Sequence, residues 1–159
     1  MPRSWALFGL LLLVWVFSSA SAESVPAGNL QTVHIKLERG PCLGRCPVYS
    51  VEIDGNGKVE YKGDQFVLVK GRRTRTIAPS DVAALLDKFR AADFWSLRPA
   101  YAASVTDIPE YRITLTIGEQ TKSVVDYLGG DVGMPRRVGE LETDIDRLAG
   151  TERWVGPDP

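Results

Sequence analysis

Hydrophobic and polar residues alternate over several stretches in the first half of the chain. In residues 32–38 every second position is Val, Ile or Leu, and residues 49–54 repeat the pattern with Tyr, Val and Ile. A period of two predicts half-buried β-strands, because successive side chains of a strand point to opposite faces of the sheet. Residues 54–57, Asp-Gly-Asn-Gly, predict a hairpin turn, after which residues 59–61 resume the alternation.

Four further stretches predict strands. Residues 66–69 are an apolar run, Phe-Val-Leu-Val, which predicts a strand buried on both faces. Residues 73–77 either prolong that strand or follow it as an edge strand. Residues 111–117 alternate again, and residues 122–127 return after a turn that contains Gly. These last two stretches predict a second hairpin.

Two stretches have the period of an amphipathic helix. Residues 79–92 begin with Pro, which suits a first helical turn, and their apolar face comprises Val82, Leu85, Leu86 and Phe89. Residues 135–149 predict a second helix, ended by Gly150, with an apolar face of Val138, Leu141, Ile145 and Leu148. Between the first helix and the second hairpin, residues 98–109 predict an ordered loop of the kind that carries binding sites.

The order of these elements predicts the fold class. Short turns join the strands, and no connection is long enough for a parallel βαβ unit. We therefore expect an α+β domain: an antiparallel sheet of about six strands, in the order ββββ-α-ββ-α, with two helices packed on one face. The predicted domain spans residues 31–154, and residues 155–159 form a tail. A domain of this size buries roughly two thirds of its unfolded surface, so it needs no metal for stability.

The N-terminus has the pattern of a secretory signal peptide. Arg3 precedes an apolar run over residues 5–17, and the small residues at 18–22 suit a cleavage site. The apolar run is shorter than the roughly 20 residues that a membrane-spanning helix needs. We therefore predict a signal peptide at residues 1–22, a flexible leader at residues 23–30, and an exported protein without a membrane span after cleavage.

Length and charge exclude several classes of protein. The chain has 159 residues, with Lys+Arg 19 against Asp+Glu 20 and a formal net charge of −1. This length predicts one domain rather than a multidomain enzyme. Because there is no basic excess to contact phosphates, nucleic acid is excluded as a partner. We expect a monomer.

The two cysteines of the chain have the most distinctive spacing of any motif in the sequence. Cys42 and Cys46 are separated by three residues, and Gly44 between them supplies backbone freedom for a tight turn. In an exported chain such a pair predicts a disulfide, which would stabilise the fold by about 2 kcal/mol and fix the turn between the first two strands.

Two other interpretations of the cysteines remain open. The pair could cycle between dithiol and disulfide, with Arg39 or Arg45 stabilising a thiolate. However, the familiar redox spacing has two intervening residues and lies at a helix N-terminus. A metal site would need further ligands, and His34 is expected on the polar face of the preceding strand. We therefore expect no metal and no cofactor.

Several motifs together carry a resemblance to a known family: Ile35-Lys36-Leu37-Glu38-Arg39, Cys42-x-Gly44-x-Cys46-Pro47-x-Tyr49, Gly57-x-Val59-x-Tyr61-x-Gly63, Phe94-Trp95-x-Leu97, Tyr101, Thr106-Asp107-x-Pro109 and Val125-Asp126-Tyr127. With these motifs the chain resembles the exported bacterial family known as domain of unknown function 6438, over about residues 31–148. The resemblance implies a cell-envelope or secreted domain without an assigned activity, which in some relatives is joined to repeat modules.

Complete catalytic sets are missing from the sequence. His34 is the only histidine, so a Ser-His-Asp or Cys-His arrangement has one candidate base. Asp107 and Glu110 flank the predicted loop, and Asp126 ends the last strand. In a second interpretation, these three residues converge at one end of the sheet as paired carboxylates. An Asp before a turn or at a strand end more often bonds nearby backbone N–H groups.

One basic cluster has two interpretations. Its members, which fall along the predicted edge strand, are Arg72, Arg73 and Arg75. Charges on an edge strand guard against pairing with other chains, and they can also attract an anionic surface.

The function that these features favour is a non-catalytic binding module, exported to the periplasm or secreted, with a structural disulfide. Its partner would be a protein or a small molecule. The candidate binding surface comprises Arg45, Tyr49, Tyr101, Asp107 and Asp126. Two alternatives are kept: a small envelope enzyme, using thiol chemistry at Cys42/Cys46 or carboxylates at Asp107/Asp126, and an inhibitor-like protein whose disulfide turn enters a partner's cleft.

Overall fold

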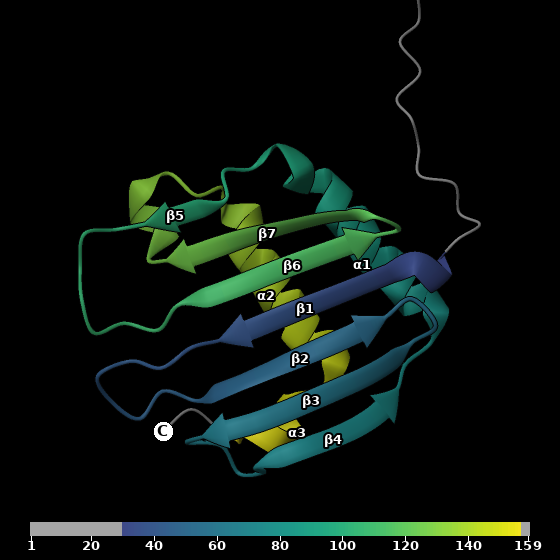
Figure 1. Cartoon of the computed structure of the whole chain (residues 1–159), viewed down its shortest axis with the longest axis horizontal. Helices are drawn as coiled ribbons and strands as arrows, with labels where there is room; N and C mark the ends of the chain where they lie inside the picture. Colours follow the sequence, from purple (N-terminus) through teal and green to yellow (C-terminus); the bar gives the residue numbers. More distant parts are fainter. Residues whose placement is uncertain (1–29, 157–159) are drawn as a thin grey trace, which may run out of the picture.

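Seven strands form one mixed sheet in the computed structural model, which describes residues 30–156 (Figure 1). The strands are β1 (Val33–Arg39), β2 (Val48–Asp54), β3 (Lys58–Gln65), β4 (Gly71–Thr76), β5 (Ala100–Ala102), β6 (Tyr111–Ile117) and β7 (Gln120–Tyr127). Their order across the sheet is β4-β3-β2-β1-β6-β7-β5. The predicted signal peptide, and all of the predicted leader except Leu30, lie outside the described residues.

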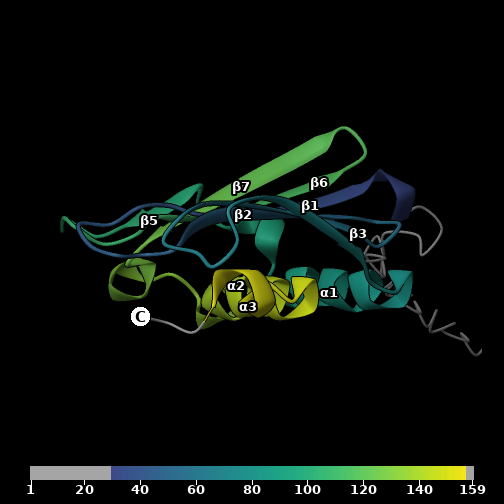
Figure 2. The ribbon, with the colours of Figure 1, turned by 90° about the horizontal axis from the view of Figure 1, so that it is seen from below.

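The helices cover one face of this sheet and leave the other face open (Figure 2). They are α1 (Pro79–Ala91), α2 (Arg136–Ala149) and the short α3 (Glu152–Val155), with 3-10 turns η1 (Leu30–Thr32), η2 (Phe94–Ser96) and η3 (Gly129–Val132). The two long helices confirm the sequence prediction, and α2 ends at Gly150 in a left-handed conformation. Within residues 30–156, no helix is long and apolar enough to cross a lipid bilayer.

The core fills the space between the sheet and the helices. Alternate residues of β1, β2 and β6 point inward, among them Ile35, Val51 and Leu115, and α1 and α2 contribute Phe89 and Ile145. A second, smaller cluster lies beside this core, where Trp154 packs on Tyr61 with ring centroids 5.0 Å apart. Trp154 therefore fixes the C-terminal turn α3 to the sheet.

The sheet differs from the prediction at one edge. The predicted loop at 98–109 contains β5, which pairs with β7 in parallel, so the sheet is mixed rather than antiparallel. A strand of three residues, in which only Tyr101 is buried, has too few positions to show a period of two. Residues 103–110 then carry the chain past β7 to β6, which allows this parallel pairing.

The predicted strand at residues 66–69 is also wrong. β3 continues to Gln65, Phe66 adopts a positive φ of 52°, and the chain bends before the edge strand β4. The Leu68 and Val69 N–H groups donate to the carbonyls of Val155 and Trp154, at 3.1 and 2.9 Å. The apolar run bonds to the C-terminal turn rather than to the sheet, and this partner is distant in sequence.

The bend passes over Gly63, and this contact generates a prediction about stability. A Cβ at position 63 would overlap the Val69 carbonyl oxygen and crowd the Tyr61 hydroxyl. We expect Gly63→Ala to lower the free energy of unfolding by about 1–3 kcal/mol, because overpacking forces the bend away from the sheet. Urea unfolding measures the change.

The matched control for this variant is Gly139→Ala in α2, where an added Cβ meets nothing within 4 Å. This substitution should stabilise the protein by about 0.5–1 kcal/mol, since alanine favours a helix interior more than glycine does. Equal effects of the two substitutions would contradict the close approach at Gly63.

Candidate functional site

A row of polar and aromatic residues crosses the sheet on the side that faces the helices. Its members lie directly opposite one another in β2, β1, β6, β7 and β5: Tyr49, Arg39, Tyr111, Asp126 and Tyr101. In β1 this position follows the buried Ile35 and Leu37 at the same period of two. The row therefore marks the limit of the apolar core. It lies at the end of the strands from which residues 40–47 and 103–110 project, on the left in Figure 1.

Asp146 of α2 ties the centre of this row together. Its Oδ2 accepts hydrogen bonds from Arg39 Nε and Nη2 at 2.9 and 2.6 Å, and its Oδ1 accepts from the hydroxyls of Tyr49 and Thr151, both at 2.8 Å. The Arg39 guanidinium also lies 4.2 Å from the centroid of the Tyr111 ring. One carboxylate of α2 thus connects β1, β2 and Thr151, which lies two residues after the end of that helix.

Electrostatics fix the protonation of these groups. Burial by itself lowers the pKa of Arg39, but the charge and hydrogen bond of Asp146, together with Tyr49 and Tyr111, outweigh burial and raise this pKa above its ordinary value. Burial, and then the charge of Asp146, raises the pKa of Tyr49. At physiological pH the guanidinium is charged and the phenol is neutral, so both donate to Asp146.

A second carboxylate of α2 lies one helical turn before Asp146. Glu142 is only 5 % exposed. Burial, and then the nearby charge of Asp126, raises the pKa of Glu142 to about 8. Glu142 is therefore protonated at neutral pH and hydrogen-bonds to Asp126. Asp126 Oδ1 also accepts from the Gly129 N–H at 2.6 Å, which fixes the turn after β7.

Sequence reasoning missed both helix carboxylates, although a signal was present. Glu142 follows Val138 by four residues and precedes Ile145 by three, so it falls on the buried face of the predicted helix. Asp146 follows Glu142 by four residues. An acidic residue on an apolar helix face requires a buried partner, and this rule indicates a polar site beneath α2.

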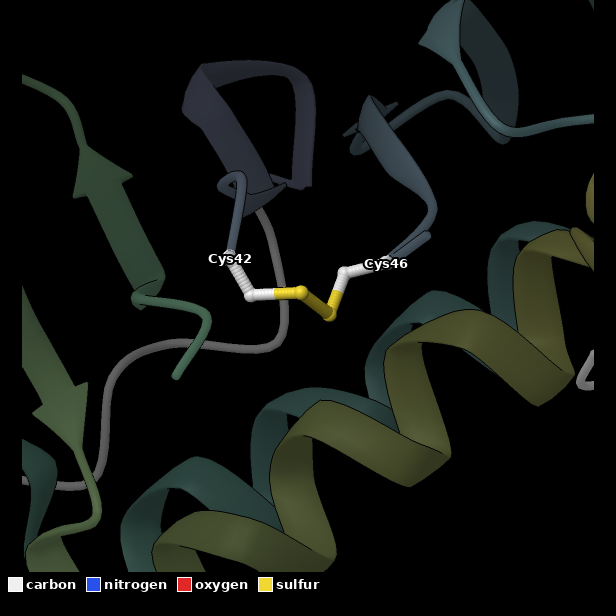
Figure 3. The surroundings of a disulfide bond; sticks show 2 residues. All are labelled: Cys42 and Cys46. Carbon is white, nitrogen blue, oxygen red and sulfur yellow. A yellow bond between two sulfur atoms is a disulfide. The ribbon is translucent and has the colours of Figure 1, made fainter. Parts of the chain in front are cut away.

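Residues 40–47 form a ridge between β1 and β2, which we call the disulfide ridge. The Cys42–Cys46 disulfide closes it, with Cα atoms 5.8 Å apart, and the predicted bond is confirmed (Figure 3). The ridge also bonds to the loop before β6, because the Gly40 N–H donates to the Glu110 carbonyl at 2.7 Å and the Leu43 N–H to the Asp107 carbonyl at 3.3 Å. The disulfide ridge and the predicted loop at 98–109 are thus brought side by side.

Two hollows flank the disulfide ridge, and Cys42 lines both. The first, which we call the helix-side pocket, has a volume of about 630 Å³ and is lined by Arg39, Cys42, Gly44, Arg45, Cys46, Pro47, Tyr49, Pro109, Tyr111, Asp146 and Val155. The second, which we call the loop-side hollow, has a volume of about 530 Å³ and is lined by Gly40, Pro41, Cys42, Leu43, Asp107, Ile108, Glu110 and Tyr127.

The five predicted surface residues divide among different places. Arg45 is exposed and lines the helix-side pocket, which Tyr49 also lines although it is buried. Asp107 is exposed and lines the loop-side hollow. Tyr101 is buried, and the Arg98 guanidinium lies 4.3 Å from the centroid of its ring. Asp126 faces α2.

Of the three predicted carboxylates, Asp107 and Glu110 line the same hollow, and Asp126 lies apart from them. Asp107 lines the loop-side hollow, whereas Asp126 contacts Glu142 beneath α2. Glu110 pairs with Arg112 at 2.8 Å. Carboxylate catalysis needs two carboxyl groups to face a common substrate, and the Asp107 and Asp126 side chains point into different surroundings.

Other candidate ligands are engaged elsewhere. His34 projects from the open face of the sheet, as predicted, and its Nδ1 lies 2.9 Å from Asp54 Oδ1. In the described part of the chain, no group of three or more His, Cys, Asp or Glu residues is placed to hold a metal ion. Of the basic cluster, Arg72 pairs with Glu60 at 2.9 Å, and Arg75 donates to the Ala149 carbonyl at 3.1 Å.

The Asp146 contacts predict a large loss of stability in Asp146→Asn. This substitution leaves the mostly buried Arg39 charge without a counter-charge, so we expect the free energy of unfolding to fall by about 3 kcal/mol. The control is Asp144→Asn on the same helix, which pairs with the exposed Lys88 and Arg147. That change should cost less than about 1 kcal/mol. Equal losses in urea unfolding would contradict the assigned role of Asp146.

Glu142 predicts a pH dependence of stability. Its pKa in the folded protein is about 8 against an ordinary 4.5, so between these values the folded protein holds a proton that the unfolded chain has released. The free energy of unfolding should therefore fall as pH rises through this window, by at most about 1.4 kcal/mol per pH unit from this group. Glu142→Gln removes the effect, so the stability of the variant relative to the unmodified protein should rise with pH.

Urea unfolding at several pH values between the two pKa values measures this dependence. The control is Glu140→Gln, an exposed residue of α2 that pairs with Arg136 at 2.8 Å, and its stability should follow that of the unmodified protein with pH. If Glu142→Gln also follows the unmodified protein, Glu142 is ionised in the fold and its proposed contact with Asp126 is wrong.

Comparison with known proteins identifies the family of this chain. A comparison with curated proteins gives no match. The family described as Domain of unknown function (DUF6438) matches residues 33–149, a stretch that contains the disulfide ridge, the polar row and α2. Since this match covers most of the chain, the protein belongs to the DUF6438 family.

Proposed function

We propose that the protein is an exported, non-catalytic binding module of the bacterial cell envelope, and that the disulfide ridge with the neighbouring loop at 103–110 is its recognition surface. The observation that carries this proposal is the placement of the ridge. A closed, cross-linked loop projects from the ends of β1 and β2 between two hollows. Two backbone hydrogen bonds anchor it to the loop at 103–110. Such a loop presents its side chains in a fixed arrangement, which lowers the entropic cost of binding.

Exposed apolar residues at this end of the molecule support a protein partner. Leu43, in the ridge, is 80 % exposed, and Phe66 and Leu68 of the nearby bend are 45 and 71 % exposed. Arg45 joins the two segments, because its guanidinium lies 5.9 Å from the centroid of the Phe66 ring. Exposed large apolar residues that gather at one end of a domain are typical of a surface that a partner covers.

The absence of a cleft with a complete catalytic set in the described residues favours binding over catalysis. Among the described residues, the helix-side pocket is lined by one carboxylate, Asp146, which already accepts hydrogen bonds from three side chains. The cysteines lie between two strands, whereas redox-active pairs lie at a helix N-terminus that stabilises the thiolate. The disulfide therefore acts as a structural clamp in this proposal.

Site-specific photocrosslinking tests the proposed surface. We expect Leu43→p-benzoylphenylalanine to give a discrete crosslinked product in the cells that produce the protein, because this side chain is at the centre of the proposed contact. The control places the same group at Trp95, which is 41 % exposed and lies in η2, away from the ridge. Products of equal yield from both positions, or from neither, would contradict the proposal.

A second arm tests whether the disulfide shapes the surface. In the double variant Cys42→Ser/Cys46→Ser we expect the free energy of unfolding to fall by about 2 kcal/mol and the crosslink from position 43 to weaken, because the ridge loses its closed form. An undiminished crosslink would show that recognition does not depend on the ridge conformation.

A further inference from the structure

We propose that the helix-side pocket binds an extended peptide segment of the partner protein, which places a carboxylate on Arg45 and an adjacent apolar side chain against the pocket wall. This inference rests on the proposed function and names the chemistry of the partner. It is carried by the charge of the pocket, by its walls and by the apolar residues at its rim.

Among the residues that the structure describes, the helix-side pocket has one uncompensated positive charge, that of Arg45. Arg39 and Asp146 both line it, but they neutralise each other through two hydrogen bonds. Arg45 is exposed, and among the described residues it has no carboxylate partner, only the Phe66 ring at 5.9 Å. A guanidinium in this state is able to offer two parallel N–H donors to a carboxylate, the geometry for which arginine is best suited.

The walls of the pocket suit an apolar side chain beside that carboxylate. Pro47, Pro109 and Val155 line it together with Tyr111, whose ring is held in place by the Arg39 guanidinium. Its volume of about 630 Å³ falls within the usual range of ligand sites. Because Asp146 fixes Arg39, and the disulfide fixes the ridge, the pocket is formed before a ligand arrives.

The opposite side of the ridge determines which hollow the carboxylate enters. Among the described residues, the loop-side hollow is lined by no basic residue, by Asp107, and by Glu110, which pairs with Arg112. A carboxylate is repelled there and attracted to Arg45, so the charge difference across the ridge orients an acidic ligand.

The rim of the pocket indicates a peptide rather than a small organic acid. Val155 lines the pocket, and its carbonyl accepts from the N–H of the exposed Leu68. Phe66 contacts Arg45 on the same side. A small acid would fill the pocket and leave these apolar side chains in water, whereas a chain that continues out of the pocket covers them.

An NMR titration of the ¹⁵N-labelled, oxidised protein tests the proposal with defined peptides. The probes are N-acetyl-Leu-Ala-Leu with a free carboxylate, the same peptide as its C-terminal amide, and N-acetyl-Leu-Glu-Leu amide. We expect the two carboxylate peptides to shift the amide resonances of Arg45, Tyr111 and Val155, and the neutral amide to bind at least about tenfold more weakly. The stronger carboxylate peptide then distinguishes a chain terminus from an acidic side chain.

Variants of Arg45 complete the test. Arg45→Gln should weaken carboxylate binding at least about tenfold, and Arg45→Lys should retain part of it, because the charge remains while the paired donors are lost. The control is Arg90→Gln, which removes an exposed arginine of α1 that pairs with Asp87, and it should leave the titration unchanged. Because Arg45 is exposed and makes no hydrogen bond to another residue in the described part of the chain, these variants should fold normally.

Three outcomes would overturn the proposal. These are equal affinity for the acid and amide peptides, binding that survives Arg45→Gln, and no shift at the pocket residues at up to about 5 mM peptide. Binding of 3-phenylpropanoate as tight as that of the peptides would assign the pocket to small organic acids instead. A crosslink at position 43 that persists while the peptides fail would leave the binding surface intact and reject this ligand alone.

Discussion

The site depends on the hydrogen bonds that the Asp146 carboxylate accepts. This carboxylate accepts from Arg39 at the end of β1, from Tyr49 near the start of β2, and from Thr151 just after α2. The two strands are those that the disulfide ridge connects, so one helix residue fixes both ends of the ridge. Thr151 immediately precedes α3, whose Trp154 packs on Tyr61. A charge in this position is stable only because every donor around it is satisfied, which makes the arrangement specific.

Two constraints of different kinds therefore act on the same eight-residue segment. The hydrogen-bond network holds its ends, and the covalent bond between Cys42 and Cys46 closes its middle. The result is a projecting loop whose exposed side chains, Leu43 and Arg45, have little freedom to lose on binding. Within residues 30–156, the same network leaves Arg45 as the one unneutralised charge of the helix-side pocket. Fold stability and recognition chemistry are thus properties of one set of contacts.

Much of this architecture could be predicted from local patterns, and the remainder depends on distant contacts. Most of β1, β2, β4, β6 and β7 follows from alternation and turn residues, but only residues 59–61 of β3 do. Both long helices follow from their apolar faces. The cysteine spacing in the context of two strands predicted the disulfide. β5 could not be predicted because three residues carry no period, and residues 66–69 were misassigned because their partner is the C-terminal turn. Asp146 and Glu142 join α2 to strands that are distant in sequence, so their partners could not be predicted. The one signal in the sequence was that both carboxylates fall on the apolar face of the helix.

The reduction potential of the Cys42–Cys46 disulfide in the purified protein tests the central claim most directly. It is measured by alkylation with a mass label across a series of glutathione buffers. A structural clamp in a binding module should have a potential below about −300 mV, beyond reduction by the glutathione pool. A potential near or above about −200 mV, with one thiol reactive at neutral pH, would contradict the account and make thiol exchange the function of this site.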